Sequence, residues 1–553
     1  MVFERSSHSG VEDFLSLHRR AAQMPERVAL VAPGRGPLSY RELGDSLRTA
    51  RRALTGAGLR PGEIAALVLP NGPELITAFL AISGIGAGAP LNPALTEDEY
   101  QFYLSRLGAR SLILGDGATS PAATAACALG MRVLRIHSSR NDAAGVFTLD
   151  AAEHAEPEFP VRTTDAALLL FTSATTGFPK LVPLTWGNLQ TMAFRETSAL
   201  QLSEADRFLS LMPLFHLHGL AAVLAQLHCG GTVISTPAFN PATFLNWLEQ
   251  FQPTWLSSNP PLNRAILTLA REHPEVFRRI PLRLIRSTGA APAPEELAWL
   301  EEAVGAPVLT GYGLTEAGGV TRETPEARKP GSAGRTSGLE VAIMDPLGNL
   351  LAAELEGEIA VRGASVTAGY LDDPEANQVA FHDGWFHTGD IGRLDSEGFL
   401  FITGRRKEII NRGGEKIVPQ EVDEVLAAHP ALADAAVFAV AHRTLGEDVA
   451  AAVVLRNGAA ASELELRRFA ATRLASFKVP RRILFLDRIP RTATGKAQRD
   501  VLAEQFRNRV RLPSELTSPR GQTVEARLIA IWRRTLERTH RRAADGGVRP
   551  APL

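Results

Sequence analysis

The sequence predicts an α/β fold divided into more than one domain, and three observations carry this prediction. The chain has 553 residues, more than one ordinary hydrophobic core accommodates. Strand-like apolar runs alternate with helical patterns through its first two thirds, which is typical of layered α/β structure. From about Glu356 the pattern changes to short β segments separated by glycine and aspartate turns. We therefore expect a large α/β part followed by a smaller one.

The predicted strands of the large part are short apolar runs separated by helical patterns. They are "ALLLF" at 167–171, "RFLSLMPLF" at 207–215, "GTVIST" at 231–236, "LRLIRST" at 282–288 and "APVLTGYG" at 306–313. Two further β segments, "GEIAVRG" at 357–363 and "GFLFITG" at 398–404, precede a predicted domain boundary near Arg405.

The region after Arg405 predicts a small α+β domain. An amphipathic helix is expected at 419–430, with strands at 433–442 and 449–455. A linker-like stretch then leads to "TVEARLIAIWRRTLERT" at 523–539, a helical pattern, and to an end without a packing signal. The predicted division is a large domain at 1–404, a small one at 405–507, and a linker with a terminal helix at 508–553.

Composition excludes several classes of protein. Lys and Arg total 59 against 60 Asp and Glu, a balance that argues against a strongly basic nucleic-acid binder. Two cysteines, Cys127 and Cys229, cannot form a disulfide framework, and the first residues lack the apolar core of a signal peptide. Polar residues and glycines interrupt the most apolar region, so no integral membrane segment is expected. These observations favour a cytoplasmic protein.

The segment "FTSATTGFPK" at 171–180 has the character of a phosphate-binding loop, because an apolar run leads into hydroxyls, a glycine and a lysine. It lacks the Walker spacing, since Phe178 and Pro179 separate Gly177 from Lys180. In "PRTATGK", ending at Lys496, proline stands where the first Walker glycine belongs. A phosphate bound by either segment is therefore held by a loop that differs from the Walker motif.

Histidines at 216, 218 and 228, with Cys229, raise the alternative of a metal site, because alternate residues of a strand share a face. Their spacing is not diagnostic of zinc, so a pocket-lining role is the favoured interpretation for His216. The glycines of "GIGAGA" at 84–89 open no helix and do not indicate dinucleotide binding. No G-x-S-x-G segment supports a serine hydrolase.

Three further segments combine groups that suit a nucleotide. "PVLTGYGLTEAGG" brings together Tyr312, Thr315 and Glu316, an aromatic ring, a hydroxyl and a carboxylate suited to a base, a phosphate and a magnesium ion. Asp390 and Arg405 supply a carboxylate that can accept ribose hydroxyls and an arginine that can assist it. Each segment alone also fits an ordinary turn or an exposed loop.

The ordered set of motifs resembles the adenylate-forming superfamily of acyl-CoA synthetases, peptide-synthetase adenylation domains and luciferases. The motifs are "FTSATTGFPK", "MPLFHLHGL", "STGAAPAP", "GYGLTEAGG", "GWFHTGD", "GRRKEIINRGGEKI" and "PRTATGK", and the resemblance runs from about Phe14 to Phe506. Within it, "MPLFHLHGL" and "INRGGEKI" are most similar to CoA ligases of the oxalate–CoA ligase type. The resemblance implies a small β-barrel-like part in the large domain and a mobile small domain.

The resemblance implies a site for ATP and Mg²⁺. The residues that match its phosphate loop are Thr172, Ser173, Thr175, Thr176, Gly177 and Lys180. Ala174 replaces the usual glycine, which predicts slower or more selective pyrophosphate handling if the position needs a positive φ and no effect if it does not. Tyr312 is expected to stack near adenine, opposite the backbone of Gly289, Ala290 and Ala291. Thr315 and Glu316 are expected to hold phosphate and magnesium, and Asp390 with Arg405 to hold the ribose.

The resemblance also assigns the reacting acid and thiol. Lys496 is expected to bridge the acid carboxylate and the α-phosphate, with Glu316 and His216 completing the catalytic set. Gly414 is expected to line a tunnel for a pantetheine thiol and Lys407 to act as the hinge of the small domain. Leu217 stands where amino-acid-activating relatives carry an aspartate, so a small carboxylic acid without an α-amine is favoured. Trp186 replaces a histidine common after the phosphate loop.

Three functions remain open on this reading. The first is an acyl-CoA ligase. The second is an adenylation enzyme that loads an acyl carrier protein of a biosynthetic assembly line, since the helix at 523–539 is similar to the opening helix of a phosphopantetheine carrier domain. The third is a nucleotide-binding protein without catalysis, which the retention of Lys496, Glu316 and Asp390 argues against.

Overall fold

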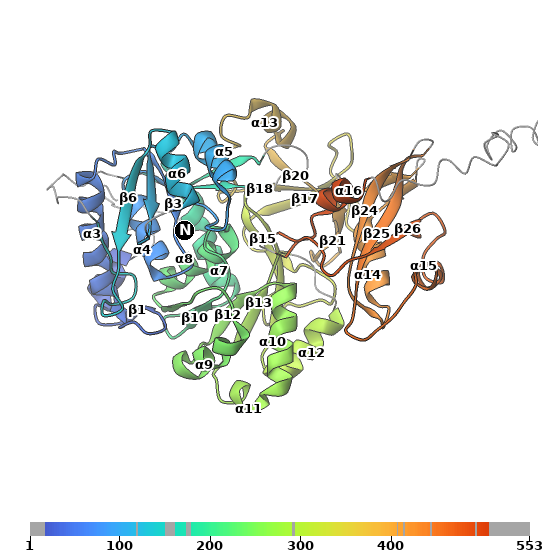
Figure 1. Ribbon diagram of the computed structural model, residues 1–553, viewed down its shortest axis with the longest axis horizontal. Coiled ribbons are helices and arrows are strands. Elements are labelled where there is room, and N and C mark those ends of the chain that lie inside the picture. Colours follow the sequence, from blue (N-terminus) through green and yellow to red (C-terminus); the bar gives the residue numbers. More distant parts are fainter. Residues whose placement is uncertain are drawn as a thin grey trace, which may run out of the picture.

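Two mainly parallel sheets build the large N-terminal domain. The computed structural model describes residues 17–117, 120–149, 161–172, 179–289, 294–405, 408–412, 415–442, 445–492 and 495–507. Figure 1 shows most of the seven-stranded sheet and its helices in blue and the small C-terminal domain in orange and red. The nine-stranded sheet is green and yellow except for its two blue strands within residues 28–39. The predicted α/β class with a large and a small domain is confirmed.

The first sheet has the strand order β7-β6-β5-β3-β4-β8-β9. Its strands are β3 (Ile64–Val68), β4 (Ala87–Pro90), β5 (Ser111–Leu114), β6 (Arg132–His137), β7 (Thr148–Leu149), β8 (Ala166–Phe171) and β9 (Leu181–Thr185). The inner strands are parallel, and β7 and β9 add antiparallel edges. The apolar run predicted at 167–171 forms β8, an almost wholly buried strand, as expected where helices cover both faces.

The second sheet has the order β16-β15-β14-β13-β12-β10-β11-β1-β2. Its strands are β1 (Val28–Val31), β2 (Leu38–Ser39), β10 (Arg207–Ser210), β11 (Thr232–Ser235), β12 (Trp255–Ser258), β13 (Leu284–Ser287), β14 (Val308–Leu314), β15 (Gly318–Arg322) and β16 (Arg335–Thr336). From β1 to β14 the neighbours run parallel, whereas β2, β15 and β16 are antiparallel. The carboxyl ends of β10, β12, β13 and β14 therefore meet at one edge.

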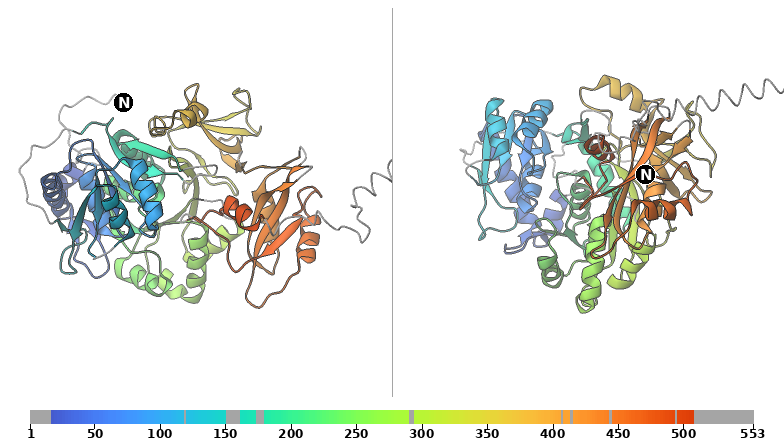
Figure 2. Two further views of the ribbon diagram at one scale, coloured as in Figure 1. Left: turned by 45° about the horizontal axis from the view of Figure 1, so that its top comes forward. Right: turned by 45° about the vertical axis from the view of Figure 1, so that its right-hand side comes forward.

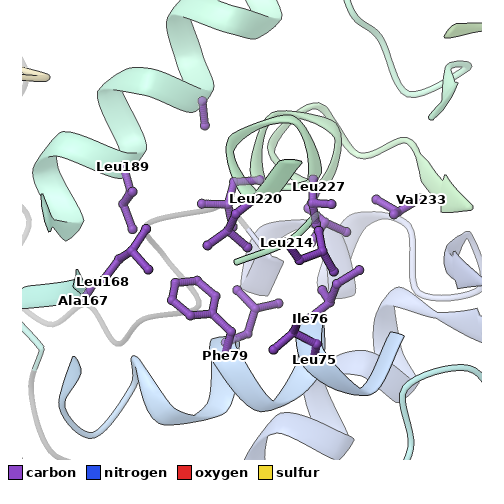
Figure 3. Packing of buried hydrophobic residues seen from close by; sticks show 14 of the residues in the cluster. Leu75, Ile76, Phe79, Ala167, Leu168, Leu189, Leu214, Leu220, Leu227 and Val233 are labelled. Atoms are coloured by element: carbon purple, nitrogen blue, oxygen red, sulfur yellow. The ribbon is translucent and has the colours of Figure 1, made fainter. Parts of the chain in front are cut away.

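Helices pack on the sheets in several apolar cores. They are α2 (Leu17–Gln23), α3 (Tyr40–Gly56), α4 (Pro73–Ile82), α5 (Glu97–Leu107), α6 (Pro121–Ala128), α7 (Trp186–Ala199), α8 (Leu217–Cys229), α9 (Pro241–Phe251), α10 (Pro260–Glu272), α11 (Pro274–Phe277), α12 (Pro294–Val304) and α13 (Pro374–Ala380). The core that contains α3, α4, α7 and α8 includes strands of both sheets. Figure 3 shows Leu75 and Phe79 of α4 facing Leu220 of α8, with Leu189 of α7 beside them. Apolar packing between α4 and α7/α8 thus joins the two sheets.

The residue Trp186 has a structural explanation. Its side chain is fully buried, and the indole Nε1 donates to the Ser83 carbonyl, 2.9 Å away. A capping box between Thr185 and Asn188 starts α7 at this tryptophan. Trp186 therefore fixes the start of α7 against the end of α4.

The histidine segment lies on a helix, where a strand was predicted. Strand β10 ends at Ser210, so the expected strand at 207–215 is four residues long, and His216 is the N-cap of α8. A Cβ at Gly219 would lie 2.5 Å from the Pro213 carbonyl oxygen, so a glycine is needed where the turn meets the helix. The argument that alternate strand residues share a face therefore fails for His216 and His218.

The third sheet follows the two large ones along the chain. It contains β17 (Glu340–Met344), β18 (Gly357–Arg362), β19 (Phe381–His382), β20 (Trp385–Leu394) and β21 (Leu400–Arg405), with every pairing antiparallel. Both predicted β segments, at 357–363 and 398–404, are confirmed as β18 and β21. Among the described residues the strand pairings do not close into a barrel.

The small domain has its own sheet and core. Strands β22 (Ile410–Arg412), β23 (Glu415–Ile417), β24 (Leu432–His442), β25 (Gly446–Leu455) and β26 (Arg482–Phe485) form the sheet, with helices α14 (Pro419–Ala427), α15 (Glu463–Ala471) and α16 (Arg499–Phe506). Apolar residues of α14 and α15 pack on one face, and Leu502 of α16 packs on the other. The helix predicted at 419–430 and the two strands after it are confirmed. Residues 508–553 lie outside the described residues, and the predicted domain limits stay predictions.

A turn of the small domain touches the large domain. A Cβ at Gly495 would lie 3.0 Å from the Pro261 side chain at the start of α10, and Gly495 has a φ of +88°. Figure 2 shows the small domain against the green and yellow part of the large one in both views. None of the helices within the described ranges combines the length and apolar character needed to cross a bilayer.

Candidate active site

The predicted site residues gather at the carboxyl edge of the nine-stranded sheet. Ser258 at the end of β12 pairs with Ser287 at the end of β13, which pairs in turn with Thr310 of β14. Asn259, Thr288 and Gly311 follow these residues along the chain. In open α/β sheets, ligands bind in the crevice outside this edge.

Tyr312, Asp390 and Arg405 form a hydrogen-bonded group. The Tyr312 hydroxyl donates to Asp390 Oδ2 at 2.5 Å. Arg405 lies opposite Asp390 in the β20/β21 register and donates to both carboxylate oxygens, with Nη2 3.3 Å from Oδ2. Burial, with the adjacent Asp390 charge, raises the pKa of Tyr312 well above its usual value, so the phenol remains a neutral donor. The structure thus brings together the residues predicted for adenine and ribose.

Glu316 is held by a tyrosine that the sequence reasoning missed. Tyr370 donates its hydroxyl to Glu316 Oε1 at 2.8 Å, and the Lys180 ammonium lies 4.3 Å from the centre of the Tyr370 ring. Burial raises the pKa of Glu316, while the Tyr370 hydrogen bond and the charges of Arg405 and Lys180 oppose this shift. Tyr370 belongs to no recognised motif, so the sequence carried no signal for it.

Lys180 and Thr172 bracket the predicted phosphate loop. The Thr172 amide donates to the Lys180 carbonyl at 2.9 Å, so the two ends of the loop lie side by side. Ser173, Thr175, Thr176 and Gly177 lie outside the described residues, as does Ala174. Thr315 is described and precedes Glu316 directly.

Lys496 lies on a tight turn of the small domain. The Thr492 amide donates to the Lys496 carbonyl at 2.8 Å, and the Lys496 ammonium lies 2.5 Å from Glu408 Oε1. Burial and the nearby Arg405 charge lower the pKa of Lys496, whereas Glu408 and Asp390 raise it. The charges of Asp390 and Arg405, the two residues predicted to bind the ribose, therefore act on the pKa of Lys496. Glu408 was not predicted from the sequence, although it directly follows Lys407, the predicted hinge residue.

Several predicted residues fall outside the described part of the chain. These are Lys407, Gly414, Ala290 and Ala291. Gly289 is described and has a φ of +98°, a conformation that favours glycine at the turn after β13. The roles predicted for Lys407, Gly414, Ala290 and Ala291 remain predictions.

His216 is the N-cap of α8, and His218 lies in its first turn. His216 Nε2 is buried and has no hydrogen-bond partner, and burial lowers the pKa of His216 to about 4. His218 Nε2 lies 2.6 Å from the Ser257 hydroxyl and 3.0 Å from the Thr288 hydroxyl. Burial, with the Arg286 and Arg322 charges, places the pKa of His218 well below its usual value, so both rings are neutral near pH 7. No group of three metal-ligating side chains occurs among the described residues.

Comparison with known proteins places the chain in a family. The model for AMP-binding enzymes matches residues 17–371, and the model for the C-terminal domain of AMP-binding enzymes matches residues 421–496. The chain belongs to the AMP-binding enzymes. The resemblance to the adenylate-forming superfamily is thereby confirmed.

Curated relatives of this AMP-binding enzyme include oxalate–CoA ligases. The protein from Arabidopsis thaliana is 39% identical over 504 residues, covering 89% of this chain and 98% of that protein. The oxalate–CoA ligase of Saccharomyces cerevisiae is 36% identical over 530 residues, covering 89% and 97%. The narrower resemblance to this type of ligase is also confirmed.

Solved structures share the fold. ATP-bound MatB from Rhodopseudomonas palustris superposes with a TM-score of 0.82 at 27% identity, covering 90% of this chain and 99% of that one. The o-succinylbenzoate CoA synthetase MenE from Bacillus subtilis, in complex with its acyl-adenylate intermediate, gives 0.76 at 31% identity, covering 88% and 97%.

Proposed function

We propose that the protein activates a small carboxylic acid with ATP and transfers the acyl group to CoA. In the first step an acid oxygen attacks the α-phosphorus, forming an acyl-adenylate and releasing pyrophosphate. In the second step the thiol sulfur attacks the acyl carbon, forming the thioester and releasing AMP and the thiol proton. The observation that carries the proposal is that the turn of Lys496 lies against the carboxyl edge of the sheet, since a Cβ at Gly495 would lie 3.6 Å from Asn259, and that Lys496 there feels the charges of Asp390 and Arg405.

The nucleotide is held by groups whose chemistry suits it. Asp390 has a carboxylate that can accept ribose hydroxyls, and Arg405 forms an ion pair with it. Glu316 offers buried carboxylate oxygens, the donors that Mg²⁺ prefers, and Tyr370 fixes their orientation. Bound with the phosphates, Mg²⁺ would neutralise charge on the pyrophosphate leaving group. Lys496 would stabilise the charge that develops between acid and α-phosphate.

The acceptor is proposed to be the pantetheine thiol of CoA. The curated relatives named above carry CoA ligase in their names, and Gly414 matches the position that must stay small for the thiol arm. Gly414→Leu should spare pyrophosphate release and block thioester formation. Equal loss of both steps would contradict the tunnel assignment. Loading of an acyl carrier protein is the second candidate, carried by the helical pattern at 523–539.

The setting is proposed to be the reducing cytoplasm. Cys127 and Cys229 are both free thiols, and burial raises the pKa of Cys229 to about 11, so that thiol stays protonated.

The test is ATP-dependent pyrophosphate release over a panel of short, dicarboxylic, fatty and aryl acids, with and without CoA. We expect release that CoA stimulates, together with an acyl-CoA of matching mass. Release without an acyl-CoA would indicate a carrier protein as acceptor. If none of the acids in the panel causes pyrophosphate release, the proposed function is overturned.

A further inference from the structure

A β-bulge interrupts strand β20 at Asp390. The pairing of β20 with β18 places Ile391 opposite Glu358. The register then shifts and places His387 opposite Ala360, so three residues of β20 lie opposite one residue of β18. Bulges are frequent next to active sites, where they redirect a side chain. This bulge, residues 388–390, is called the Asp390 bulge below.

Glu358 of β18 anchors the Asp390 bulge. Its Oε1 accepts from the amide of Gly389, which has a φ of +73°, and the two atoms lie 3.1 Å apart. A bulge takes residues out of the ladder between two strands, so their amides need other acceptors. The Glu358 side chain is only 14% exposed, and it supplies such an acceptor from the strand that the bulge has left.

Thr388 and His387 complete the anchoring. The Thr388 hydroxyl donates to the Ile359 carbonyl at 2.8 Å and accepts from the Asp390 amide at 3.1 Å. The His387 ring contacts the other oxygen of Glu358, with Nδ1 3.4 Å from Oε2. Both oxygens of Glu358 therefore have a partner in the segment that leads to Asp390.

The Asp390 bulge determines the direction of the Asp390 carboxylate. The side chain is buried, at 5% exposed, and its oxygens accept from Tyr312 and Arg405. Its backbone amide is bound on the other side, by Thr388. The carboxylate is thus held from the strand β21 that carries Arg405, and its backbone is held from β18.

We propose that Glu358 is a positioning residue for the nucleotide, which fixes the Asp390 bulge and so lets the Asp390 carboxylate select ribose over 2′-deoxyribose. This rests on the proposed function, in which Asp390 accepts hydrogen bonds from the ribose hydroxyls. A hydrogen bond weakens steeply when its angle departs from linear, so a bulge that is free to shift loses this selection. Glu358 acts through Gly389 and does not touch the nucleotide.

The first experiment is an equilibrium titration of the whole chain with ATP and with 2′-deoxyATP, without any acid. We expect the wild type to bind ATP about tenfold more tightly or better, the scale of one hydrogen bond to a charged group. Glu358→Ala should reduce the ratio of the two Kd values about fivefold or more. An equal affinity in the wild type, or an unchanged ratio in Glu358→Ala, would overturn the proposal.

This titration distinguishes the positioning role from the proposed function. Binding needs no turnover, so a chain that releases no pyrophosphate with any acid would overturn the proposed function and still give the two Kd values. A wild type that binds neither nucleotide would overturn both.

The second experiment separates the anchoring by Glu358 from its charge. Glu358→Gln keeps an oxygen at the same reach for the Gly389 amide, so the preference for ATP should stay near that of the wild type. Glu358→Asp keeps the charge but is one methylene shorter, so the preference should fall as in Glu358→Ala. The reverse order would show that charge alone acts and would overturn the anchoring. If Glu358→Ala does not fold, these two variants decide.

The third experiment tests whether Glu358 acts through Asp390. Asp390→Asn removes the selecting carboxylate, so adding Glu358→Ala to it should lower the ratio of the two Kd values no further. Two losses that simply add would show that Glu358 has a general structural effect and would overturn the proposal.

Glu354→Ala is the matched control. Glu354 also accepts from a backbone amide, that of Ser396 at 3.3 Å, and it also contacts a basic side chain, Arg393. These contacts lie at the opposite end of β20 from its start at Trp385, beyond the Asp390 bulge. The ratio of the two Kd values should therefore stay at the wild-type value. A fall as large as in Glu358→Ala would show that any carboxylate beside β20 has this effect, which would overturn the assignment to Glu358.

Discussion

Two groups of buried charges in the large domain differ in how they are balanced. In the first, Asp390 pairs with Arg405 and accepts from Tyr312. In the second, Glu196 pairs with both Arg286 and Arg322, and Arg195 lies nearby. One carboxylate thus meets one guanidinium in the first group and two in the second. The second group therefore keeps an excess of buried positive charge, which is costly to maintain.

The largest effect is expected at Lys496. Lys496→Ala should slow adenylate formation by about 10²–10³-fold and leave ATP binding largely intact, because one preorganised charge is lost from the transition state. Pyrophosphate release measures the first effect and equilibrium ATP titration the second.

Lys478→Ala is the control for Lys496→Ala. Lys478 is also a lysine of the small domain, and it pairs with Glu421 at 2.6 Å. Its loss should leave the rate near that of the wild type. An unchanged rate in Lys496→Ala would contradict the role assigned to Lys496.

A smaller effect is expected from Asp390→Asn. The amide cannot accept from Arg405 and the ribose as a carboxylate does, so the KM for ATP should rise about 10- to 100-fold. The ratio of the kcat/KM values for two different acids should stay constant, because Asp390 is proposed to bind the ribose and is bonded to Tyr312 and Arg405. Steady-state kinetics at saturating acid and then at saturating ATP measure the two quantities. A shift in acid preference would contradict a role of Asp390 that is confined to the nucleotide.

The smallest effect at neutral pH is expected from Glu408→Gln, and its sign follows from the pKa of Lys496. Burial lowers that pKa and Glu408 raises it, so removing the carboxylate lowers it further. The protonated lysine is needed for adenylation and would be lost at lower pH. The alkaline limb of the pH–rate profile for pyrophosphate release should therefore move toward lower pH.

Glu421→Gln is the control for Glu408→Gln. It removes another carboxylate of the small domain that pairs with a lysine, Lys478, and it should leave the alkaline limb in place. The role assigned to Glu408 would be refuted if the alkaline limb of the pH–rate profile stays in place in Glu408→Gln. It would also be refuted if this limb moves equally in both variants.

The sequence predicted those residues that belong to local motifs. Tyr312, Glu316, Asp390, Arg405 and Lys496 stand in short segments with a recognisable composition, and the apolar runs predicted β8, β13 and β14. The fold brings these segments together because the strands they follow end at one edge.

The residues that sequence reasoning missed act across long separations. Tyr370 meets Glu316 over 54 positions, Arg286 meets Glu196 over 90, and Glu408 meets Lys496 over 88. No periodicity or spacing encodes such pairs, since they depend on which helix covers which strand. The strand expected at 207–215 is present only as far as Ser210, because the chain turns at Met212 and Pro213 before α8 begins.

The pair between Lys496 and Glu408 has a consequence for the movement of the small domain. Both residues follow the proposed hinge at Lys407, and Arg499 of α16 also contacts Glu408, with its Nε 3.2 Å from Oε2. In the proposed rotation Lys496 would therefore travel with its own counter-ion. Because the pair between Lys496 and Glu408 would stay intact, the rotation should depend less strongly on ionic strength than one that separates an ion pair.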